Sequence, residues 1–366
     1  MPLLPSQAKT ETCRNLAIVG ANVFNSVMVL GLGLILGQSP EETGPALAEP
    51  PPEVWDRPLA EDAFSEPLSP VLEEALNAAM DELTDRAPGV AAALYVPGEG
   101  MWSGVAGNVE QGSLLPVGSV TKMFTAVAAH ALAAERDDLH LDKPLQDLEK
   151  PATLSQLLRH TSGMSLMSDK MFQFSPGEGF SYSNSGFSYV GRTLEDATGE
   201  SLEEIFQRLI YTPAGLVDTK LPEKFEPRVP HAHVEGKPVD KALTFLAARN
   251  DAAAGALLST PSDLVRFLHA LLSYRLLPRE VVQEMFTDMR PTPDATAAFG
   301  SGVMLYTPPQ GPGPLLGHSG TLSGFRTAAT YVVEDDIYVA LVFTERNAPA
   351  EAGVWQLIQA FREARG

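Results

Sequence analysis

The chain has 366 residues, of which 44% are hydrophobic and 20% charged, enough to build a sizeable buried core. Its formal net charge of -20 at pH 7 repels phosphate backbones, which argues against nucleic acid as a partner. Cys13 is the only cysteine, which excludes an intramolecular disulfide and a cysteine-based metal cluster.

The N-terminal segment, residues 1–37, is predicted to reach a membrane. Residues 16–37 carry no charge, and a helix over this range would be about 33 Å long, enough to cross a bilayer. Lys9 and Arg14 precede it and acidic residues follow it, so the positive-inside rule places the rest of the chain outside the cytoplasm. We therefore expect a membrane-anchored or secreted protein, in the periplasm or at the cell surface.

Three interpretations of this segment stay open. An uncleaved anchor uses the whole apolar run. A cleaved signal peptide is also consistent, because residues 27–36 have the length of an h-region and Ala46-Leu47-Ala48 resembles a cleavage site. A buried helix of a soluble protein is the third interpretation, and only the first two export the domain.

Residues 38–68 differ from the rest in composition. They contain seven prolines, and eight carboxylates against one base, Arg57. Prolines interrupt regular structure, and like charges extend a chain. We predict a disordered linker here, followed by one globular domain at residues 69–366.

Helical and strand patterns are distributed unevenly along this domain. A capped amphipathic helix opens it at Ser69–Arg86. Apolar periodicity predicts further helices, mostly in the middle of the chain: Ser119–Arg136, Leu154–His160, Tyr189–Thr198, Leu202–Tyr211, Ser262–Tyr274 and Ala350–Arg365. Strand-like runs lie near both ends: Gly89–Val96, Met101–Ala106, Gly302–Tyr306, Thr327–Val333 and Ile337–Thr344. This order predicts an α+β fold, an α/β sandwich whose antiparallel sheet is built from both chain ends and flanked by helices, with a mostly helical inserted region.

The string Ser119-Val120-Thr121-Lys122 opens an apolar, alanine-rich helix. Residues three apart are neighbours on a helix, so Lys122 can reach the Ser119 hydroxyl. The helix dipole favours oxyanion charge in the first turn, and a lysine among apolar side chains loses its proton more easily. These features suit a nucleophile and its base. A second Ser-x-x-Lys, from Ser6 to Lys9, has no such context, and the string alone also fits an N-cap serine before a solvated lysine.

Two further strings follow in chain order. Tyr182-Ser183-Asn184 lies in a turn-rich stretch before an apolar helix, where a phenol can shuttle a proton and an amide can bind a substrate carbonyl and orient Lys122. His318-Ser319-Gly320 lies beside a predicted strand, where small residues let a substrate lie against the strand edge. Taken singly, each string also fits a surface turn. In the predicted fold all three can meet at one cleft.

The other histidines are interpreted as structural or solvated. His160, within Arg159–Gly163, fits a helix end before a glycine stop. His231 and His233 lie two residues apart near Pro230, without a carboxylate or cysteine pattern beside them. We therefore predict no metal site.

Together the three strings resemble the serine β-lactamase and D-Ala-D-Ala carboxypeptidase superfamily, most closely its class C β-lactamase, peptidase and esterase branch. The resemblance covers residues 70–364. Family-like flanking strings support it: Gly118 before Ser119, Leu157–Gly163, Ser175-Pro176-Gly177, Gly255–Thr260 and Gly317 before His318. It implies a β-lactamase/transpeptidase-like fold.

The resemblance also implies a role for each matched residue. Ser119 would be acylated, with Lys122 as its base and Tyr182 as the proton shuttle. Four residues would bind the substrate: Asn184, His318, Ser319 and Gly320. The backbone N–H groups of Ser119 and Thr321 would form the oxyanion hole. The resemblance implies no cofactor.

The third string departs from the family pattern, because His318 stands where class C β-lactamases usually carry the lysine of Lys-Thr-Gly. An unperturbed histidine is mostly neutral at pH 7 and is a poor anchor for a substrate carboxylate. Some D-Ala-D-Ala carboxypeptidases of this branch carry a histidine here, and several of its esterases and peptidases also lack the lysine. Efficient β-lactam hydrolysis is therefore disfavoured.

We expect an exported serine hydrolase that forms an acyl-enzyme on an amide or ester, foremost a D-Ala-D-Ala carboxypeptidase-like peptidase of the penicillin-binding kind. An esterase or a weak β-lactamase of the same fold is the alternative, so the substrate would be a peptidoglycan stem, a small ester or a β-lactam. Residues 166–174 and 229–240 are expected to set specificity. The rival from another class is a non-catalytic, membrane-tethered ligand-binding sensor or scaffold, against which the intact Ser119, Lys122, Tyr182 and Asn184 argue.

Overall fold

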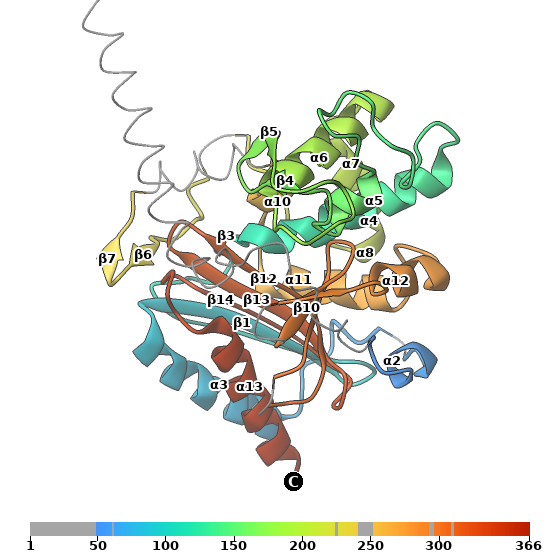
Figure 1. Cartoon of the computed structure of the whole chain (residues 1–366). Helices are drawn as coiled ribbons and strands as arrows, with labels where there is room; N and C mark the ends of the chain where they lie inside the picture. The colour runs from blue at the N-terminus through green and yellow to red at the C-terminus, as the bar shows by residue number, and fades with distance from the viewer. Residues whose placement is uncertain (1–48, 61, 224–225, 241–251, 293–295, 309–310) are drawn as a thin grey trace, which may run out of the picture. The chain divides into compact units, whose positions relative to one another are not determined.

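The computed structural model describes residues 49–60, 62–223, 226–240, 252–292, 296–308 and 311–366. An antiparallel eight-stranded sheet runs through the centre in the order β2-β1-β14-β13-β12-β11-β10-β9 (Figure 1). Its strands, in the same order, are Gly100–Gly107, Gly89–Val96, Ile337–Phe343, Phe325–Val332, Leu315–Leu322, Met304–Tyr306, Ala297–Phe299 and Arg290–Pro291. β1 pairs with β14, so strands from the two ends of the chain are neighbours. The predicted α+β sandwich with a sheet built from both chain ends is confirmed.

Helices cover both faces of this sheet (Figure 1). On one face, α3 (Pro70–Leu83) and α13 (Ala350–Arg365) share a hydrophobic core with Val90 and Leu94 of β1. On the other face, α4 (Thr121–Glu135) and α11 (Pro261–Leu272) share a second core with Ala93 and Tyr95. Alternate residues of β1 thus face opposite layers, as the pleat of a strand requires. Because both of its faces are covered, β1 is buried along its whole length and reads as an unbroken apolar run.

The region between β2 and β9 is mostly helical, as the periodicity predicts. Its helical elements are the 3-10 helix η2 (Gly118–Val120), α4, α5 (Leu154–Leu158), α6 (Asn184–Thr198), α7 (Leu202–Phe206), the π-helix η3 (Gln207–Tyr211), α8 (Thr212–Ala214), α10 (Ala252–Gly255), α11 and α12 (Arg279–Met285). Three short ladders accompany them: β3 (Leu115–Pro116) with β8 (Leu258–Ser259), β4 (Met164–Ser165) with β5 (Ser168–Phe172), and β6 (His233–Val234) with β7 (Lys237–Pro238).

Two differences from the sequence prediction concern the strings of the candidate site. The helix predicted from Tyr189 begins at Asn184, because the Ser183 hydroxyl accepts a hydrogen bond from the Gly186 N–H and caps α6. The string from His318 to Gly320 lies inside strand β12, although its glycines suggested a turn. Gly320 is tolerated there because the backbone beside it approaches too closely for a side chain.

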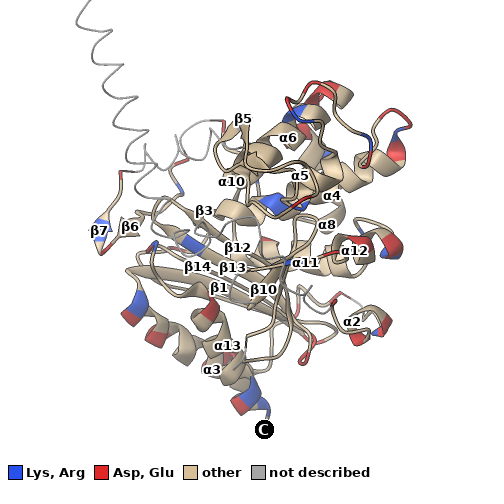
Figure 2. Ribbon diagram, in the orientation of Figure 1, with Lys and Arg blue, Asp and Glu red and all other residues tan. Residues whose placement is uncertain are grey.

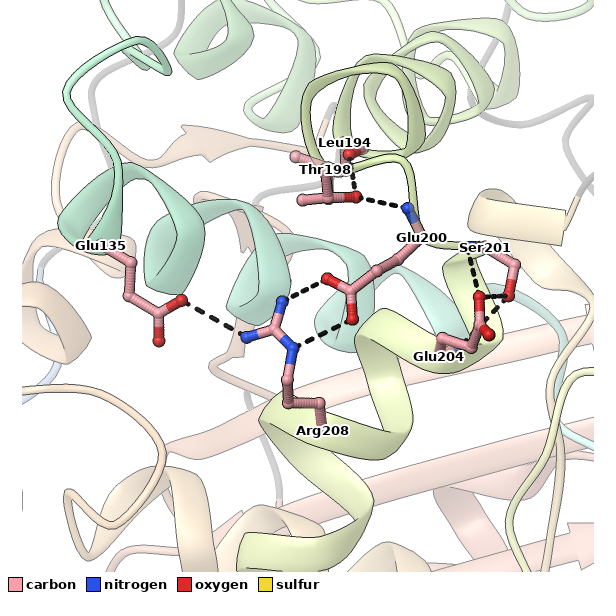
Figure 3. A network of polar contacts seen from close by, with 7 residues as sticks. All are labelled: Glu135, Leu194, Thr198, Glu200, Ser201, Glu204 and Arg208. Atoms are coloured by element: carbon pink, nitrogen blue, oxygen red, sulfur yellow. Dashed lines mark hydrogen bonds and ion pairs between the residues drawn. The ribbon is translucent and has the colours of Figure 1, made fainter.

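A polar network joins the ends of two long helices (Figure 3). Arg208 of η3 donates to both carboxylate oxygens of Glu200, at 3.1 and 2.6 Å, and to Glu135 at the end of α4, at 3.4 Å. Glu200 follows α6, and the Ser201–Glu204 capping box then opens α7. Exposed ion pairs contribute little stability each, so we expect this network to add little to the stability of the fold. Because α4 carries Lys122 and α6 carries Asn184, it also connects the two helices that supply the site.

The prediction of a disordered linker over residues 38–68 is wrong for residues 49–60 and 62–68, which we call the strap. Val54 of α2 (Glu53–Asp56) is 1% exposed, and the Ala63 N–H donates to the Tyr95 hydroxyl at 3.1 Å. The strap therefore packs on the domain instead of extending from it. Residues 38–48 lie outside the described part of the chain.

Arg57 is the main polar anchor of the strap. Its guanidinium donates to Asp336 at 2.6 Å and to the Tyr338 hydroxyl, and it stacks 4.2 Å from the ring centre of Tyr331. Two of the acidic residues that predicted an extended chain pair with cations of the domain: Asp56 with Arg279 at 2.7 Å, and Asp62 with Arg275. Repulsion between the carboxylates does not extend the strap, because cations distant in sequence offset part of its negative charge.

Charged side chains lie mostly on helices and connecting loops, and the sheet is nearly bare of them (Figure 2). Among the residues that the structure describes, no helix is long and apolar enough to cross a membrane. The predicted anchor or signal peptide at residues 1–37 lies outside these residues.

Candidate active site

Ser119 sits in η2, immediately before α4, and is half-buried. Lys122 lies in the first turn of α4, completely buried, with its Nζ 3.1 Å from Ser119 Oγ. Nearly all of α4 is apolar and buried, so the helix runs through the interior and carries this lysine with it. The i, i+3 spacing in the sequence thus yields the predicted contact.

Lys122 has further partners from two other segments. Its Nζ donates to Asn184 Oδ1 at 2.8 Å and to the Ala254 carbonyl of α10 at 2.7 Å. The same nitrogen lies 4.8 Å from the ring centre of Tyr182 and 5.4 Å from that of Phe187. Two strong acceptors and two aromatic rings therefore hold the amine in one position beside Ser119.

Tyr182 approaches the nucleophile from the segment before α6. Its hydroxyl donates to Ser119 Oγ at 2.7 Å, and its side chain is buried. Ser119 Oγ therefore lies between an amine and a phenol. The structure brings the first two sequence strings together at hydrogen-bonding distance.

His160 positions the second string, a contact that the sequence did not reveal. It adopts a left-handed backbone conformation, with φ of 59°, and is 1% exposed. Its Nδ1 accepts a hydrogen bond from the Ser183 N–H at 3.1 Å, and its ring centre lies 4.3 Å from that of Tyr182. Burial, followed by the charge of Lys122, lowers the pKa of His160 well below its usual 6.5. The ring is thus a neutral platform under Tyr182; the signal for it was Arg159–Gly163, which we interpreted as a helix end only.

Strand β12 presses against the turn that holds Ser119. A Cβ on Gly320 would lie 2.0 Å from the Val117 carbonyl oxygen and 2.9 Å from the Ser119 nitrogen. A Cβ on Gly118, which has φ of 55°, would lie 2.7 Å from the Thr321 nitrogen. These two glycines let the main chains at Ser119 and Thr321 approach to a separation that side chains would forbid.

The pairing of β12 directs its main-chain groups. Leu322 pairs with Phe325 across a two-residue turn, so hydrogen bonding to β13 alternates and the Thr321 N–H points away from β13. On that side β11 pairs only with Leu315–Gly317. The main chains at Ser119 and Thr321 are therefore neighbours, and the Thr321 N–H is not used in the pairing with β13. The Thr321 hydroxyl instead accepts a hydrogen bond from Arg326 at 2.8 Å.

His318 carries no charge at neutral pH. It is 2% exposed, and burial, together with the charge of Lys122, lowers the pKa of His318 to about 3. Its Nδ1 donates to the Ser319 carbonyl at 2.5 Å, which leaves Nε2 as a hydrogen-bond acceptor. The ring packs 6.2 Å from that of Phe299. Ser319 itself is half-buried and, by strand alternation, lies on the other face from His318.

Neighbouring segments hold α10 in place against α4. Thr125 Oγ1 donates to the Ala253 carbonyl at 2.7 Å, and Thr121 Oγ1 accepts from the Leu257 N–H at 3.1 Å. This packing places the Ala254 carbonyl beside Lys122. The sequence did not predict this contact; its nearest signal was the family-like string that begins at Gly255. In the part of the chain that the structure describes, no group of three or more metal-ligating side chains is close enough to hold an ion.

Comparisons with known proteins show the family of this chain. The family model described as Beta-lactamase matches residues 76–362. The D-aminopeptidase of Cereibacter sphaeroides is 25% identical over 331 residues, which cover 78% of this chain and 63% of that protein. Penicillin-binding protein 4* of Bacillus subtilis is 25% identical over 258 residues, which cover 59% and 57%. The D-amino acid amidase of Ochrobactrum anthropi complexed with L-phenylalanine amide superposes with a TM-score of 0.72 and 25% identity, covering 81% of this chain and 99% of that one. This chain thus spans about 63% of the length of the first curated relatives, and the predicted resemblance is confirmed.

Proposed function

We propose that this chain, which belongs to the β-lactamase family of serine hydrolases, cleaves the amide bond that follows a D-amino acid, through an acyl-enzyme on Ser119. The observation that carries the proposal is the position of Ser119 Oγ, 3.1 Å from Lys122 Nζ and 2.7 Å from the Tyr182 hydroxyl. A nucleophile between a base and a proton shuttle is the arrangement that acyl transfer needs.

Lys122 acts as the base in acylation. In the resting structure Lys122 Nζ donates to Asn184 Oδ1, to the Ala254 carbonyl and to Ser119 Oγ. Once this amine has lost one proton, it keeps two hydrogens for Asn184 and Ala254 and turns a lone pair toward Ser119. Ser119 Oγ forms a bond to the substrate carbonyl carbon while Lys122 takes its proton. The N–H groups of Ser119 and Thr321 stabilise the oxyanion that forms.

Tyr182 completes the reaction. It passes a proton to the leaving nitrogen and is recharged from Lys122, so the C–N bond breaks and an amine leaves. A water molecule then attacks the acyl-enzyme, gives its proton to the same pair, and releases the acid and Ser119. The net reaction is amide plus water giving acid plus amine, with the enzyme unchanged.

The choice of a neutral amide rests on His318. With its pKa lowered to about 3, His318 offers a substrate carboxylate no positive charge, and Nε2 is suited to accept from a leaving-group N–H. The names of the D-aminopeptidase and D-amino acid amidase relatives support the same substrate class. The second candidate is a D-Ala-D-Ala carboxypeptidase, which the similarity to penicillin-binding protein 4* favours.

The test compares the full chain with Ser119→Ala on D-alanine amide, on a peptide ending in D-Ala-D-Ala and on penicillin G. We expect turnover of the D-amide and loss of turnover in Ser119→Ala, with circular dichroism and melting unchanged. Intact-mass analysis should show an acyl adduct on the wild type only. Hydrolysis confined to the D-Ala-D-Ala peptide would favour the second candidate, and stoichiometric binding without product would favour a non-catalytic sensor.

We also propose that residues 1–37 export this domain and hold it at the membrane, an inference that rests on the charge pattern of the sequence. Alkaline phosphatase fused at residue 49 should be active in a bacterial host if the segment exports it. An inactive fusion of normal abundance would contradict export.

A further inference from the structure

The turn between β4 and β5 holds an exposed methionine beside the site. Leu166 and Met167 form this turn, and the Met167 side chain is 46% exposed. Its Sδ lies 4.0 Å from Asn184 Nδ2, on the residue whose Oδ1 accepts from Lys122. A single exposed apolar side chain is ordinary by itself, so the informative observation is its position beside a site group. Methionine in such a position is common at adaptable binding surfaces.

Main-chain contacts fix this turn to the start of α6. The Leu166 carbonyl accepts from the Asn184 N–H at 3.1 Å and from the Ser185 N–H at 3.2 Å. The Ser165 carbonyl accepts from Ser183 Oγ at 2.8 Å. None of these contacts uses the Met167 side chain. A substitution at Met167 therefore changes the wall of the site and leaves the turn and Asn184 in place.

The direction of the reaction assigns Met167 to one half of the substrate. The Tyr182 hydroxyl faces the leaving nitrogen, to which it delivers a proton. Asn184 reaches Ser119 only through Lys122, and its Nδ2 has the thioether of Met167, a weak acceptor, as its partner. A substrate carbonyl oxygen on the acyl side is a stronger acceptor for that N–H, and the group attached to it would then lie against Met167.

We propose that Met167 determines specificity for the acyl half of the substrate and selects acyl groups with an apolar side chain, aromatic ones above all. Methionine suits this role because its unbranched thioether adapts to different shapes and makes favourable contacts with rings. The proposal rests on the proposed function for the identity of the reaction. It goes beyond that function by naming the kind of substrate side chain that the site binds best and the protein residue, Met167, that contacts it.

The test uses p-nitroanilides of D-alanine, D-leucine and D-phenylalanine, which share one leaving group. Met167→Ala should lower kcat/KM for the D-phenylalanine substrate by about tenfold and leave the D-alanine substrate nearly unchanged, because pocket contacts discriminate by the apolar atoms they meet. Met167→Leu should restore most of the preference. Met171→Ala is the matched control, since Met171 lies on the same hairpin and is 63% exposed, and it should leave the preference unchanged.

An equal loss on all three anilides in Met167→Ala, or the same shift in Met171→Ala, would overturn the proposal. A parallel series of p-nitrophenyl acetate and p-nitrophenyl phenylacetate separates it from the proposed function. If the anilides are not cleaved but the ester preference depends on Met167, the amide assignment fails and this inference stands. If the anilides are cleaved but Met167→Ala does not change the preference among them, the amide assignment stands and this inference fails.

Discussion

The close approach of β12 to the nucleophile makes Gly320→Ala the sharpest test of the oxyanion site. The new Cβ would lie 2.0 Å from the Val117 carbonyl oxygen, and real Cβ atoms essentially never come within 3.0 Å of such a neighbour. The difference, 3.0 − 2.0 = 1.0 Å, is the least distance by which β12 and the turn of Ser119 must separate. The Cβ position is fixed by the backbone of β12 and the oxygen belongs to the backbone at Val117, so no flexible side chain can yield instead.

A separation of this size should reduce catalysis strongly. Misplacing reacting groups by about 1 Å costs about 100-fold in rate, and losing one oxyanion donor costs about 100- to 1000-fold, or about 2.7–4 kcal/mol. We therefore expect kcat/KM of Gly320→Ala to fall by at least about 100-fold on the best amide or ester substrate.

Gly317→Ala on the same strand is the matched control. Its Cβ would also lie 2.0 Å from a backbone oxygen, that of Ala329, but far from Ser119 in the register of β12. Both variants should lower the melting temperature, and only Gly320→Ala should lower the activity of the folded enzyme. If Gly320→Ala folds and keeps wild-type kcat/KM, Thr321 is not an oxyanion donor.

Two stability predictions follow from buried polar groups. Burial lowers the pKa of His130 and His269 to about 4 and that of His318 to about 3, all below the 6.5 of an unfolded histidine. The contribution of these neutral histidines to the free energy of unfolding is therefore complete above pH 6.5 and falls as the pH drops toward 3. Urea unfolding should show a lower free energy at pH 5 than at pH 7, and equal values would contradict it. Arg57→Met should cost about 2 kcal/mol of unfolding free energy because it breaks charged hydrogen bonds of the strap. The control Arg86→Met removes only an exposed contact to Gln356 and should cost little. Equal losses of unfolding free energy in urea would refute the role of the strap.

The site strings were predictable because their chemistry is local. Ser119 and Lys122 are neighbours on any helix, and a Ser-x-x-Lys inside an apolar run fixes both the helix and the burial of its lysine. The meeting of the two chain ends was also predictable, since the strand-like runs lie at the ends and the helices between them. The resemblance supplied the remaining step, which is that Tyr182 reaches Ser119 from outside α4.

The packing of the strap and the contact of His160 with Tyr182 were not predictable because the partners are far away in sequence. Met167 lies in the loop 166–174 that the sequence predicted to set specificity, but its contact with Asn184 was not predicted. Seven prolines and eight carboxylates in residues 38–68 describe an extended chain only when no partner holds them. Here Arg279 pairs with Asp56 and Arg275 with Asp62, and the base of the segment, Arg57, binds Asp336 and Tyr338. The sequence around His160 indicates a helix end because it encodes the local left-handed backbone of that residue. The contact of His160 with Tyr182 is not local, so the sequence pattern did not reveal it. A stable fragment for the experiments should therefore start at residue 49, not at residue 69.

Two electrostatic features of the chain are consistent with the proposed preference for a neutral amide. Close to Ser119, His318 offers a substrate carboxylate no positive charge, and Lys122 already donates to Asn184 and Ala254. At long range, the net charge of -20 repels anions and attracts cations before any contact forms. An amide with a free α-amino group satisfies both conditions, and penicillin or a D-Ala-D-Ala peptide, each with a carboxylate, satisfies neither. Because His318 is neutral, it adds no second positive charge beside Lys122. The burial of His318 would therefore favour both a neutral substrate and the proton balance of the lysine.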